Sequence, residues 1–224
     1  MGFGSILDVF KADNWSSEIV ARIGKMLAIG HEMYDYASAG LLEGRLEGDP
    51  LQRIYERDKK INKIERKIRR RVVERLSLNS TRADIPSALI FMNAVKDGER
   101  IGDYVKNLHE VGGMMPAGVD RQLYRDRLGP ISAAISQMFT DTRAAFEKSD
   151  EALAGKVIKT AKANGREYEK LIREITNSDL ATPDAVCIVL MLRFYKRLVA
   201  HMGNIASTVV MPVDLIDYYD EDDE

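Results

Sequence analysis

The spacing of the apolar residues constrains the fold of this chain more than any other feature of its sequence. In one long stretch they recur every three, four or seven residues, at Ile54, Ile61, Ile64, Ile68, Val72 and Leu76. This period places them on one face of an α-helix. Similar spacing occurs in five further segments, at about 17–42, 86–112, 130–149, 151–176 and 183–210. Because alternating strand patterns are nearly absent, we expect six long helices and an all-α bundle.

The prolines indicate where several of these helices begin. A proline ring clashes inside a helix but suits the first turn. We therefore expect four helix starts, at Pro50, Pro86, Pro130 and Pro183. Asp49 and Thr182 stand directly before two of these prolines, where an N-cap residue belongs.

Composition and charge exclude several classes of protein. There are 33 Lys and Arg against 35 Asp and Glu, so the net charge is only -2 and no overall field attracts nucleic acid. Cys187 is the single cysteine and cannot form a disulfide within the chain, which fits a reducing cytoplasm. The longest apolar run, 185–192, is far shorter than the roughly 20 residues of a membrane-spanning helix. With no signal-peptide pattern at the start, we expect a cytoplasmic protein that reaches a membrane only through partners.

When the sequence is aligned with a copy of itself shifted by 97 residues, several positions match. Pro86 then falls on Pro183, Arg100 on Arg197 and Asn107 on Asn204. Two copies of a three-helix unit are therefore expected. The first unit covers about 15–113 and the second about 119–211, after an N-terminal extension at 1–14. Residues 212–224 form an acidic tail, which we expect to be disordered because its like charges repel one another.

A group of polar residues in the first unit is the strongest candidate for chemistry. At about 100° per residue, Glu99 and Asp103 lie one turn apart on one helix face. Asp58 and Asn62 are also one turn apart, on the preceding helix. If the two helices are neighbours, these oxygen atoms line a groove suited to a hard divalent cation or iron. Salt bridges to nearby arginines such as Arg100 are the alternative explanation.

Other patterns argue against an enzyme. His31, His109 and His201 stand far apart and none belongs to a Glu-x-x-His or His-Glu-x-x-His pattern, so a di-iron oxidase or a zinc protease is not expected. No phosphate-binding loop with its lysine is visible, which removes support for nucleotide hydrolysis. The basic run at 66–71 is either a surface for phosphates or acidic partners or the solvated face of a helix.

Two motifs lie on the helices that carry these polar residues. Residues 99–108 read ERIGDYVKNL, and residues 58–68 read DKKINKIERKI. The first is similar to the PhoU-family pattern E-R-I-(G/A)-D-x-x-x-N-(I/L), and the second is similar to that family's pattern D-x-x-(I/V)-(D/N)-x-(I/L)-E-x-x-I. Together with the duplicated unit, the resemblance covers about 15–211. It implies two tandem three-helix bundles.

The resemblance also implies a non-enzymatic regulator of phosphate uptake and phosphate-starvation signalling. Such proteins act on the ATPase of the phosphate ABC transporter and on its partner sensor histidine kinase, and some bind iron, zinc, magnesium or manganese. Carried onto this sequence, the metal ligands are Glu99 and Asp103 together with Asp58 and Asn62. The resemblance leaves a homodimer open.

The second unit departs from the family motif. It reads KRLVAH at 196–201, so both acidic ligands are missing and Lys196 would repel a cation. Any metal site is therefore expected in the first unit. Three other functions stay open: a carboxylate-bridged metal-binding helical protein, a PhoU-like regulator of another transporter, and a helical scaffold for oligomerisation.

Overall fold

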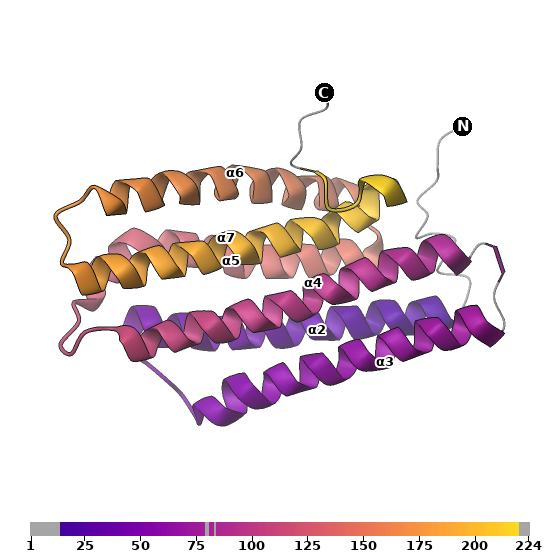
Figure 1. The fold of residues 1–224 in the computed structure, drawn as a ribbon, viewed down its shortest axis with the longest axis horizontal. Helices are drawn as coiled ribbons and strands as arrows, with labels where there is room; N and C mark the ends of the chain where they lie inside the picture. The colour runs from indigo at the N-terminus through magenta and orange to yellow at the C-terminus, as the bar shows by residue number, and fades with distance from the viewer. Residues whose placement is uncertain (1–13, 79–80, 83, 220–224) are drawn as a thin grey trace.

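The computed structural model describes residues 14–78, 81–82 and 84–219. Within them the chain forms six long helices and no strand (Figure 1), which confirms the predicted all-α class. The helices are α2 (Asn14–Ser38), α3 (Glu56–Leu78), α4 (Asp84–Glu110), α5 (Arg121–Lys148), α6 (Glu151–Thr176) and α7 (Thr182–Val210). None of these described helices carries an apolar stretch long enough to cross a membrane. All of the predicted N-terminal extension except Asn14 lies outside the described residues.

Short helical turns link or follow the long helices. Two of them are π-helical, η1 (Ala39–Glu43) and η2 (Leu51–Tyr55), and two are 3-10 turns, η3 (Val111–Met114) and η4 (Val213–Leu215). The apolar stretch from Ile54 starts in η2 and continues without a break into α3. Its buried side chains are Ile54, Ile61, Ile68 and Val72, as their spacing predicts.

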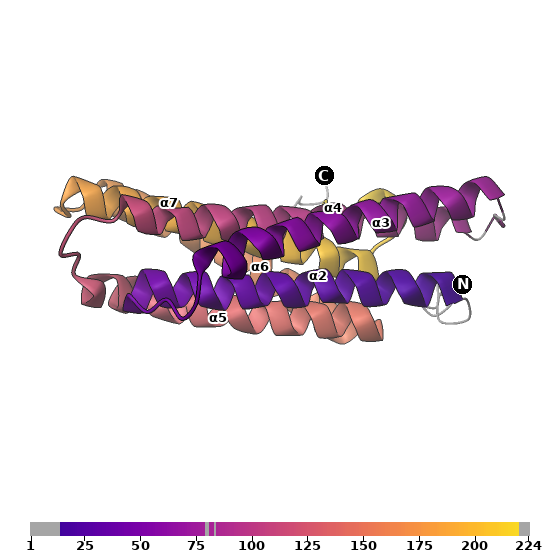
Figure 2. The same cartoon turned by 90° about the horizontal axis from the view of Figure 1, so that it is seen from below.

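The six helices form one elongated bundle with two halves, α2 to α4 and α5 to α7. α4 lies along α7, and α2 lies along α5, so these four helices join the halves. α3 and α6 lie at opposite outer edges, each packed against one helix of the α4–α7 pair (Figures 1 and 2). The buried apolar side chains of both halves form one continuous core.

The predicted helix start at Pro130 is wrong. α5 begins at Arg121, and Pro130 lies inside it. Asp120 caps the helix, because its side chain accepts a hydrogen bond of 2.9 Å from the backbone N–H of Gln122. The residue before a proline normally avoids the helical conformation because its Cβ meets the proline ring. Gly129 has no Cβ, so the helix passes through Pro130.

The two predicted N-caps have different outcomes. The Asp49 carboxylate accepts a hydrogen bond of 3.0 Å from the backbone N–H of Leu51, as a capping residue does. Thr182, in contrast, is the first residue of α7, and Ala181 is the N-cap. The proline at the start of α7 is therefore in place, but the predicted Thr182 cap is wrong.

The disorder predicted from residue 212 onwards does not hold for residues 212–219. Here η4 contacts α4, Ile216 is buried, and the backbone N–H of Asp217 donates a hydrogen bond of 3.2 Å to Oγ of Ser207 in α7. The hydroxyl of Tyr219 donates a hydrogen bond of 3.2 Å to the carbonyl oxygen of Ala200 in α7. Apolar and aromatic side chains thus hold the first part of the tail, and the charges at 220–224 lie outside the described residues.

Candidate functional site

α3 and α4 pack closely enough to bring their acidic faces together. At Gly102 of α4, an added methyl group would lie 2.9 Å from Cδ1 of Ile61 and 3.7 Å from Oδ1 of Asp58. The missing side chain of Gly102 leaves room for the end of the Ile61 side chain. The close contact buries Asp58. The two helices are therefore neighbours, as the ion-binding prediction requires.

A lysine lies between two of the predicted ligands. The ammonium of Lys106 is 3.4 Å from Oδ2 of Asp58 and 3.2 Å from Oδ1 of Asp103. Burial lowers the pKa of Lys106, but its hydrogen bond to Asp103 and the charge of Asp58 outweigh burial and hold this pKa above its usual range. Asp58 and Asp103 thus face the same side of the α3–α4 interface and share one cation.

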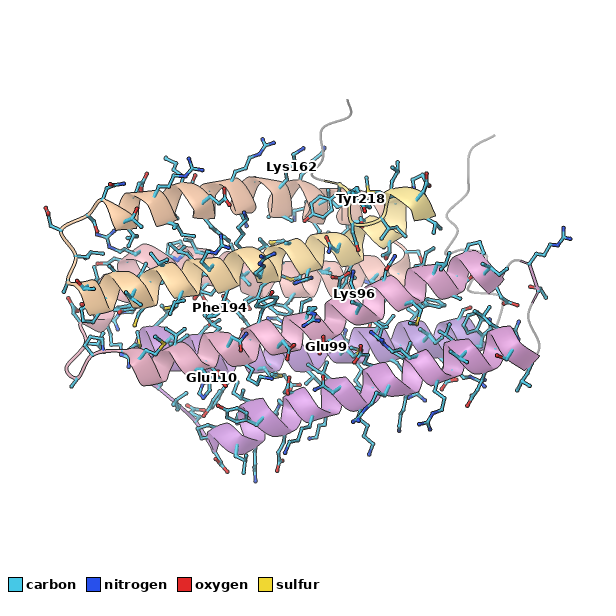
Figure 3. The ribbon with its side chains drawn as sticks, in the orientation of Figure 1. Lys96, Glu99, Glu110, Lys162, Phe194 and Tyr218 are labelled. Carbon is cyan, nitrogen blue, oxygen red and sulfur yellow. The ribbon has the colours of Figure 1, made fainter. Side chains whose placement is uncertain are left out.

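Glu99 shows that the acidic residues crowd one another. It projects from the middle of α4 (Figure 3), and its side chain is partly buried. Burial raises the pKa of Glu99, and the neighbouring charges of Asp103, Glu65 and Asp58 raise it further, against the opposing charge of Arg100. The carboxylates on this face therefore repel one another at neutral pH.

The crowding of carboxylates around Glu99 predicts that Glu99→Gln changes the free energy of unfolding in a pH-dependent way. The folded pKa of Glu99 lies above its ordinary value of 4.5, so the unfavourable charge is absent below pH 4.5 and grows as the pH rises through the folded pKa. At pH 7 the variant is expected to gain roughly 0.5 kcal/mol of unfolding free energy, since solvent screens a partly exposed carboxylate. At pH 4 it should gain nothing. Urea denaturation at the two pH values measures the difference, and an equal gain at both would contradict the prediction.

Both explanations of the acidic face have support in its contacts. Salt bridges are present, because Arg100 lies 3.4 Å from the carboxylate of Asp103 and 3.7 Å from that of Glu99. Two buried oxygen atoms, Oδ1 of Asp58 and Oδ1 of Asn62, have no hydrogen-bond partner among the described residues. Such buried, unpaired oxygens are costly unless a cation or a donor reaches them.

The donor chemistry of this face suits a hard cation, but its present geometry is not that of a finished metal site. Carboxylate and amide oxygens are the ligands that such cations prefer. Within the described residues, however, no three or more His, Cys, Asp or Glu side chains are grouped so as to hold a metal ion. Lys106 also stands between Asp58 and Asp103, so a metal would have to displace it. Metal binding here stays a prediction.

A buried polar cluster lies between the two halves and was not predicted from the sequence. The side chain of Asp97 in α4 is fully buried. Its Oδ1 lies 2.7 Å from Nδ1 of His201 and 3.2 Å from the amide nitrogen of Asn204, both in α7. Lys96, labelled in Figure 3, lies 3.8 Å from Oδ2 of Asp97. Two residues of the second half thus stabilise a carboxylate of the first.

The 97-residue repeat explains where this cluster sits. Asp97 corresponds to Phe194, and His201 corresponds to Tyr104. The rings of Tyr104 and Phe194 lie 6.3 Å apart, so the repeat places one polar pair and one aromatic pair at matching positions of the α4–α7 contact. Tyr104 also stacks on His201 at 5.4 Å. The paired positions were visible in the sequence, but their contact depends on how α4 meets α7.

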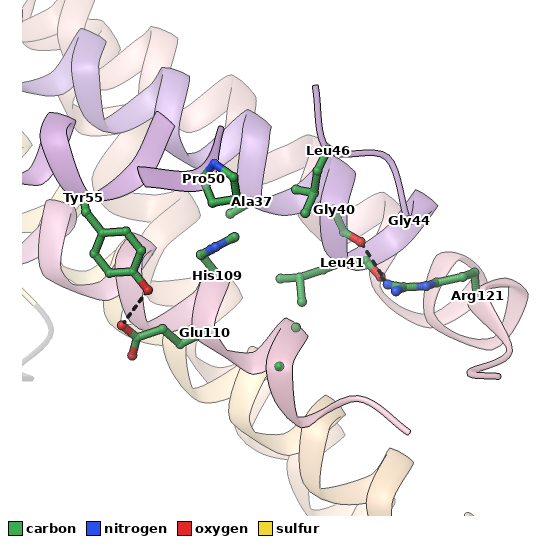
Figure 4. A pocket seen from close by; sticks show the side chains of 12 residues that line it. Ala37, Gly40, Leu41, Gly44, Leu46, Pro50, Tyr55, His109, Glu110 and Arg121 are labelled. Carbon is green, nitrogen blue, oxygen red and sulfur yellow. Dashed lines mark hydrogen bonds between the residues drawn. The ribbon is translucent and has the colours of Figure 1, made fainter. Parts of the chain in front are cut away.

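A cavity of about 440 Å³ opens where η1, η2 and the end of α4 meet α5 (Figure 4). On one wall the hydroxyl of Tyr55 donates to the carboxylate of Glu110 at 3.4 Å. On another, Arg121 donates to the carbonyl oxygen of Gly40 at 2.9 Å, which satisfies a carbonyl group at a helix end. Burial lowers the pKa of His109, a further lining residue. The hydroxyl of Tyr55 and the guanidinium of Arg121 are thus engaged within the fold.

Known proteins match both the sequence and the fold. The PhoU domain matches residues 23–111 and 130–209, one segment in each half. A phosphate-specific transport system accessory protein PhoU homolog of Pseudomonas aeruginosa is 28% identical over 165 residues, which cover 71% of this chain and 68% of that protein.

Two solved structures share the fold. PhoU from Pseudomonas aeruginosa has a TM-score of 0.75 and 24% identity, and the match covers 90% of this chain and 97% of that one. The phosphate transport system regulatory protein PhoU from Streptococcus pneumoniae has a TM-score of 0.72 and 17% identity, and the match covers 86% and 92%. At these identities the likeness shows the fold, whereas the domain match spans most of the sequence. The chain therefore belongs to the PhoU family.

Proposed function

We propose that this protein is a non-enzymatic accessory regulator of phosphate uptake and phosphate-starvation signalling. It acts in the cytoplasm, where it docks onto the ATPase of a phosphate ABC transporter or onto a phosphate-sensing histidine kinase. Docking changes the balance between the partner's conformations because the protein binds one of them more tightly. No covalent step is needed.

The observation that carries this proposal is the match of both halves to the PhoU domain. The relative from Pseudomonas aeruginosa is named for its accessory role in phosphate-specific transport, and the structure from Streptococcus pneumoniae is described as a regulatory protein of a phosphate transport system. These roles belong to those proteins, and family membership is the reason to extend them to this chain.

The outer face of α3 is the surface that best suits an acidic partner. We call it the basic α3 surface, and its exposed residues are Arg66, Lys67, Arg69, Arg70 and Arg71. Arg69 pairs with Glu65 at 2.8 Å, but Lys67 and Arg70 have no ion-pair partner among the described residues. Arg71 also pairs, with Glu18 at 3.7 Å. Because α3 lies at the outer edge of the bundle (Figure 1), the charges of Lys67 and Arg70 are available to a partner.

A pull-down experiment tests this docking. The bait is the full chain, and the candidates are the transporter ATPase and the histidine kinase of the same organism. Wild type should capture at least one of them. The double variant Lys67→Glu and Arg70→Glu should lose about tenfold or more of this capture, since it reverses charges that steer association. The matched control carries the same charge change on α6, as Lys159→Glu and Lys170→Glu, and should bind normally.

The possible failures of this experiment have different meanings. Capture of neither candidate by wild type would contradict the proposed function. Normal capture by the α3 variant would leave the function standing but would show that the basic α3 surface is not the docking face. If the α6 control lost as much capture as the α3 variant, the basic α3 surface would not be a specific docking face.

A cation in the first half is a second proposal, favoured by the unpaired buried oxygens of Asp58 and Asn62. Its ligands would be Glu99, Asp103, Asp58 and Asn62, and the ion would be a divalent cation or iron. When bound, the ion would neutralise the charge that now raises the pKa of Glu99.

Elemental analysis of protein purified without chelators tests the cation proposal. Wild type should carry metal in a fixed ratio, and Glu99→Ala and Asp103→Ala should lose it. Lys106→Gln removes the competing ammonium, so it should bind the same ion about tenfold more tightly. If wild type and Lys106→Gln both stay metal-free after incubation with Mn²⁺, Zn²⁺ or Fe²⁺, the cation proposal is wrong.

A further inference from the structure

The repeat shows which residues of α7 correspond to the acidic residues of α4. By the 97-residue repeat, Glu99 and Asp103 of α4 fall on Lys196 and Ala200 of α7. α6 lies close to α7 beside these positions, since an added methyl group at Gly203 would lie 3.0 Å from Cβ of Ala161 in α6.

In α7 one of these two acidic side chains is thus shortened to alanine and the other changes its charge. The α6 side chains beside them are small, because Ala161 and Gly165 lie next to Lys196 and Ala200.

All four of these positions line one cavity. It has a volume of about 160 Å³ and lies between α6 and α7. We call it the α6–α7 pocket and define it by Ala161, Gly165, Lys196 and Ala200. Tyr219 of the C-terminal segment forms part of its wall. The second half is therefore hollow beside the α7 positions that correspond to Glu99 and Asp103.

The charge at the α6–α7 pocket is also opposite to that of the first half. Its lining includes the cationic side chains of Lys162, Arg166 and Lys196, and Glu169 is the one carboxylate of that lining among the described residues. Lys196 is hydrogen-bonded to Glu169. This bond, followed by the charges of Lys196, Arg173 and Arg193, holds the pKa of Glu169 below its usual range. Among the described residues of the lining, cationic side chains thus outnumber carboxylates, which favours an anion.

We propose that the α6–α7 pocket binds a free oxyanion of the phosphate class. Guanidinium and ammonium groups on the rim are the donors that such anions prefer. A cavity of about 160 Å³ has room for several water molecules at about 30 Å³ each and is therefore large enough to admit a tetrahedral oxyanion. The small side chains at Ala161, Gly165 and Ala200 provide that room.

Titration calorimetry with inorganic phosphate on the full chain tests this inference, at fixed pH and ionic strength. Gly165→Leu fills the pocket, and it should fold well because no described atom lies within 4 Å of an added Cβ and leucine favours a helix over glycine. Gly155→Leu is the matched control, since Gly155 is also in α6 with equal space among the described atoms but lies outside the pocket.

We expect wild type and Gly155→Leu to bind one phosphate per chain with the same affinity, and Gly165→Leu to lose binding. Arg166→Gln should weaken binding about tenfold, because it removes a charged donor. Glu169→Gln should tighten binding, because it frees Lys196. Competition by sulfate would agree with an oxyanion site.

Three results would overturn the inference: no saturable binding by wild type, equal binding by Gly165→Leu, or equal competition by chloride. The measurement needs no partner protein. Its failure is therefore distinguishable from failure of the proposed docking function, which the inference does not require.

Discussion

Replacing His201 with alanine is expected to lower the free energy of unfolding by about 3 to 5 kcal/mol, because the substitution leaves a buried carboxylate without its main partner. Asp97 is fully buried, and its Oδ1 depends on His201 at 2.7 Å and Asn204 at 3.2 Å. The closest cation, Lys96, is 3.8 Å from the other oxygen. For a chain of this size the melting temperature should fall by about 2 to 4 °C for each kcal/mol.

A double-mutant cycle separates the loss of the charge contact from the loss of packing. Asp97→Asn keeps the shape of the side chain but removes its charge. In that background His201→Ala should cost less than about 1.5 kcal/mol, since a neutral amide left without one partner is less costly than a carboxylate. An equal cost of His201→Ala in both backgrounds would show that the pair does not hold the two halves together.

The second large effect is expected at Tyr34, which joins α2 to the second half. Tyr34 is completely buried. Its hydroxyl lies 3.1 Å from the carbonyl oxygen and 2.9 Å from Oγ of Ser132 in α5, and its ring packs against Phe139 at 5.4 Å and Tyr195 at 6.2 Å. Tyr34→Ala should therefore cost about 3 to 5 kcal/mol, as the loss of a large buried ring does.

Tyr34→Phe is the control for this prediction, because it keeps the ring and removes only the hydroxyl. It should cost about 1 kcal/mol, the usual contribution of one hydrogen bond. Thermal unfolding followed by circular dichroism compares the variants. If Tyr34→Ala left the melting temperature unchanged, or if the halves unfolded in two separate steps, the single core shared by both halves would be contradicted.

The helices could be predicted from the sequence because each one is long and amphipathic. The apolar spacing from Ile54 to Leu76 leaves little choice of structure, and tertiary packing reinforces it. The start of α5 was harder to predict, since it depends on the cap at Asp120 and on the missing Cβ of Gly129. Both residues are visible in the sequence, but Pro130 favoured a later start because proline usually opens a helix.

The acidic face was predictable for a similar reason. Spacing alone places Glu99 beside Asp103 and Asp58 beside Asn62, and the family motif pairs the two sets. The position of Lys106 was not predictable, because its contact with Asp58 depends on the register between α3 and α4. That register depends on how the side chains of both helices pack, which the sequence of neither helix reveals by itself.

The contacts between the halves lay beyond sequence reasoning. Asp97 and His201 are 104 residues apart, and only the packing of α4 on α7 brings them together. The α6–α7 pocket is defined by side chains that are small or altered relative to the first half. A pattern search looks for functional side chains that are present, so it passes over Ala161, Gly165 and Ala200.

We propose that this protein regulates phosphate uptake by docking. Uptake of radiolabelled phosphate in a strain that lacks the gene tests this claim without knowledge of the partner. We expect uptake in the deletion strain to stay high when phosphate becomes abundant, and wild-type protein to restore the normal fall. If the deletion strain reduces its uptake as the parent strain does, the claim is wrong.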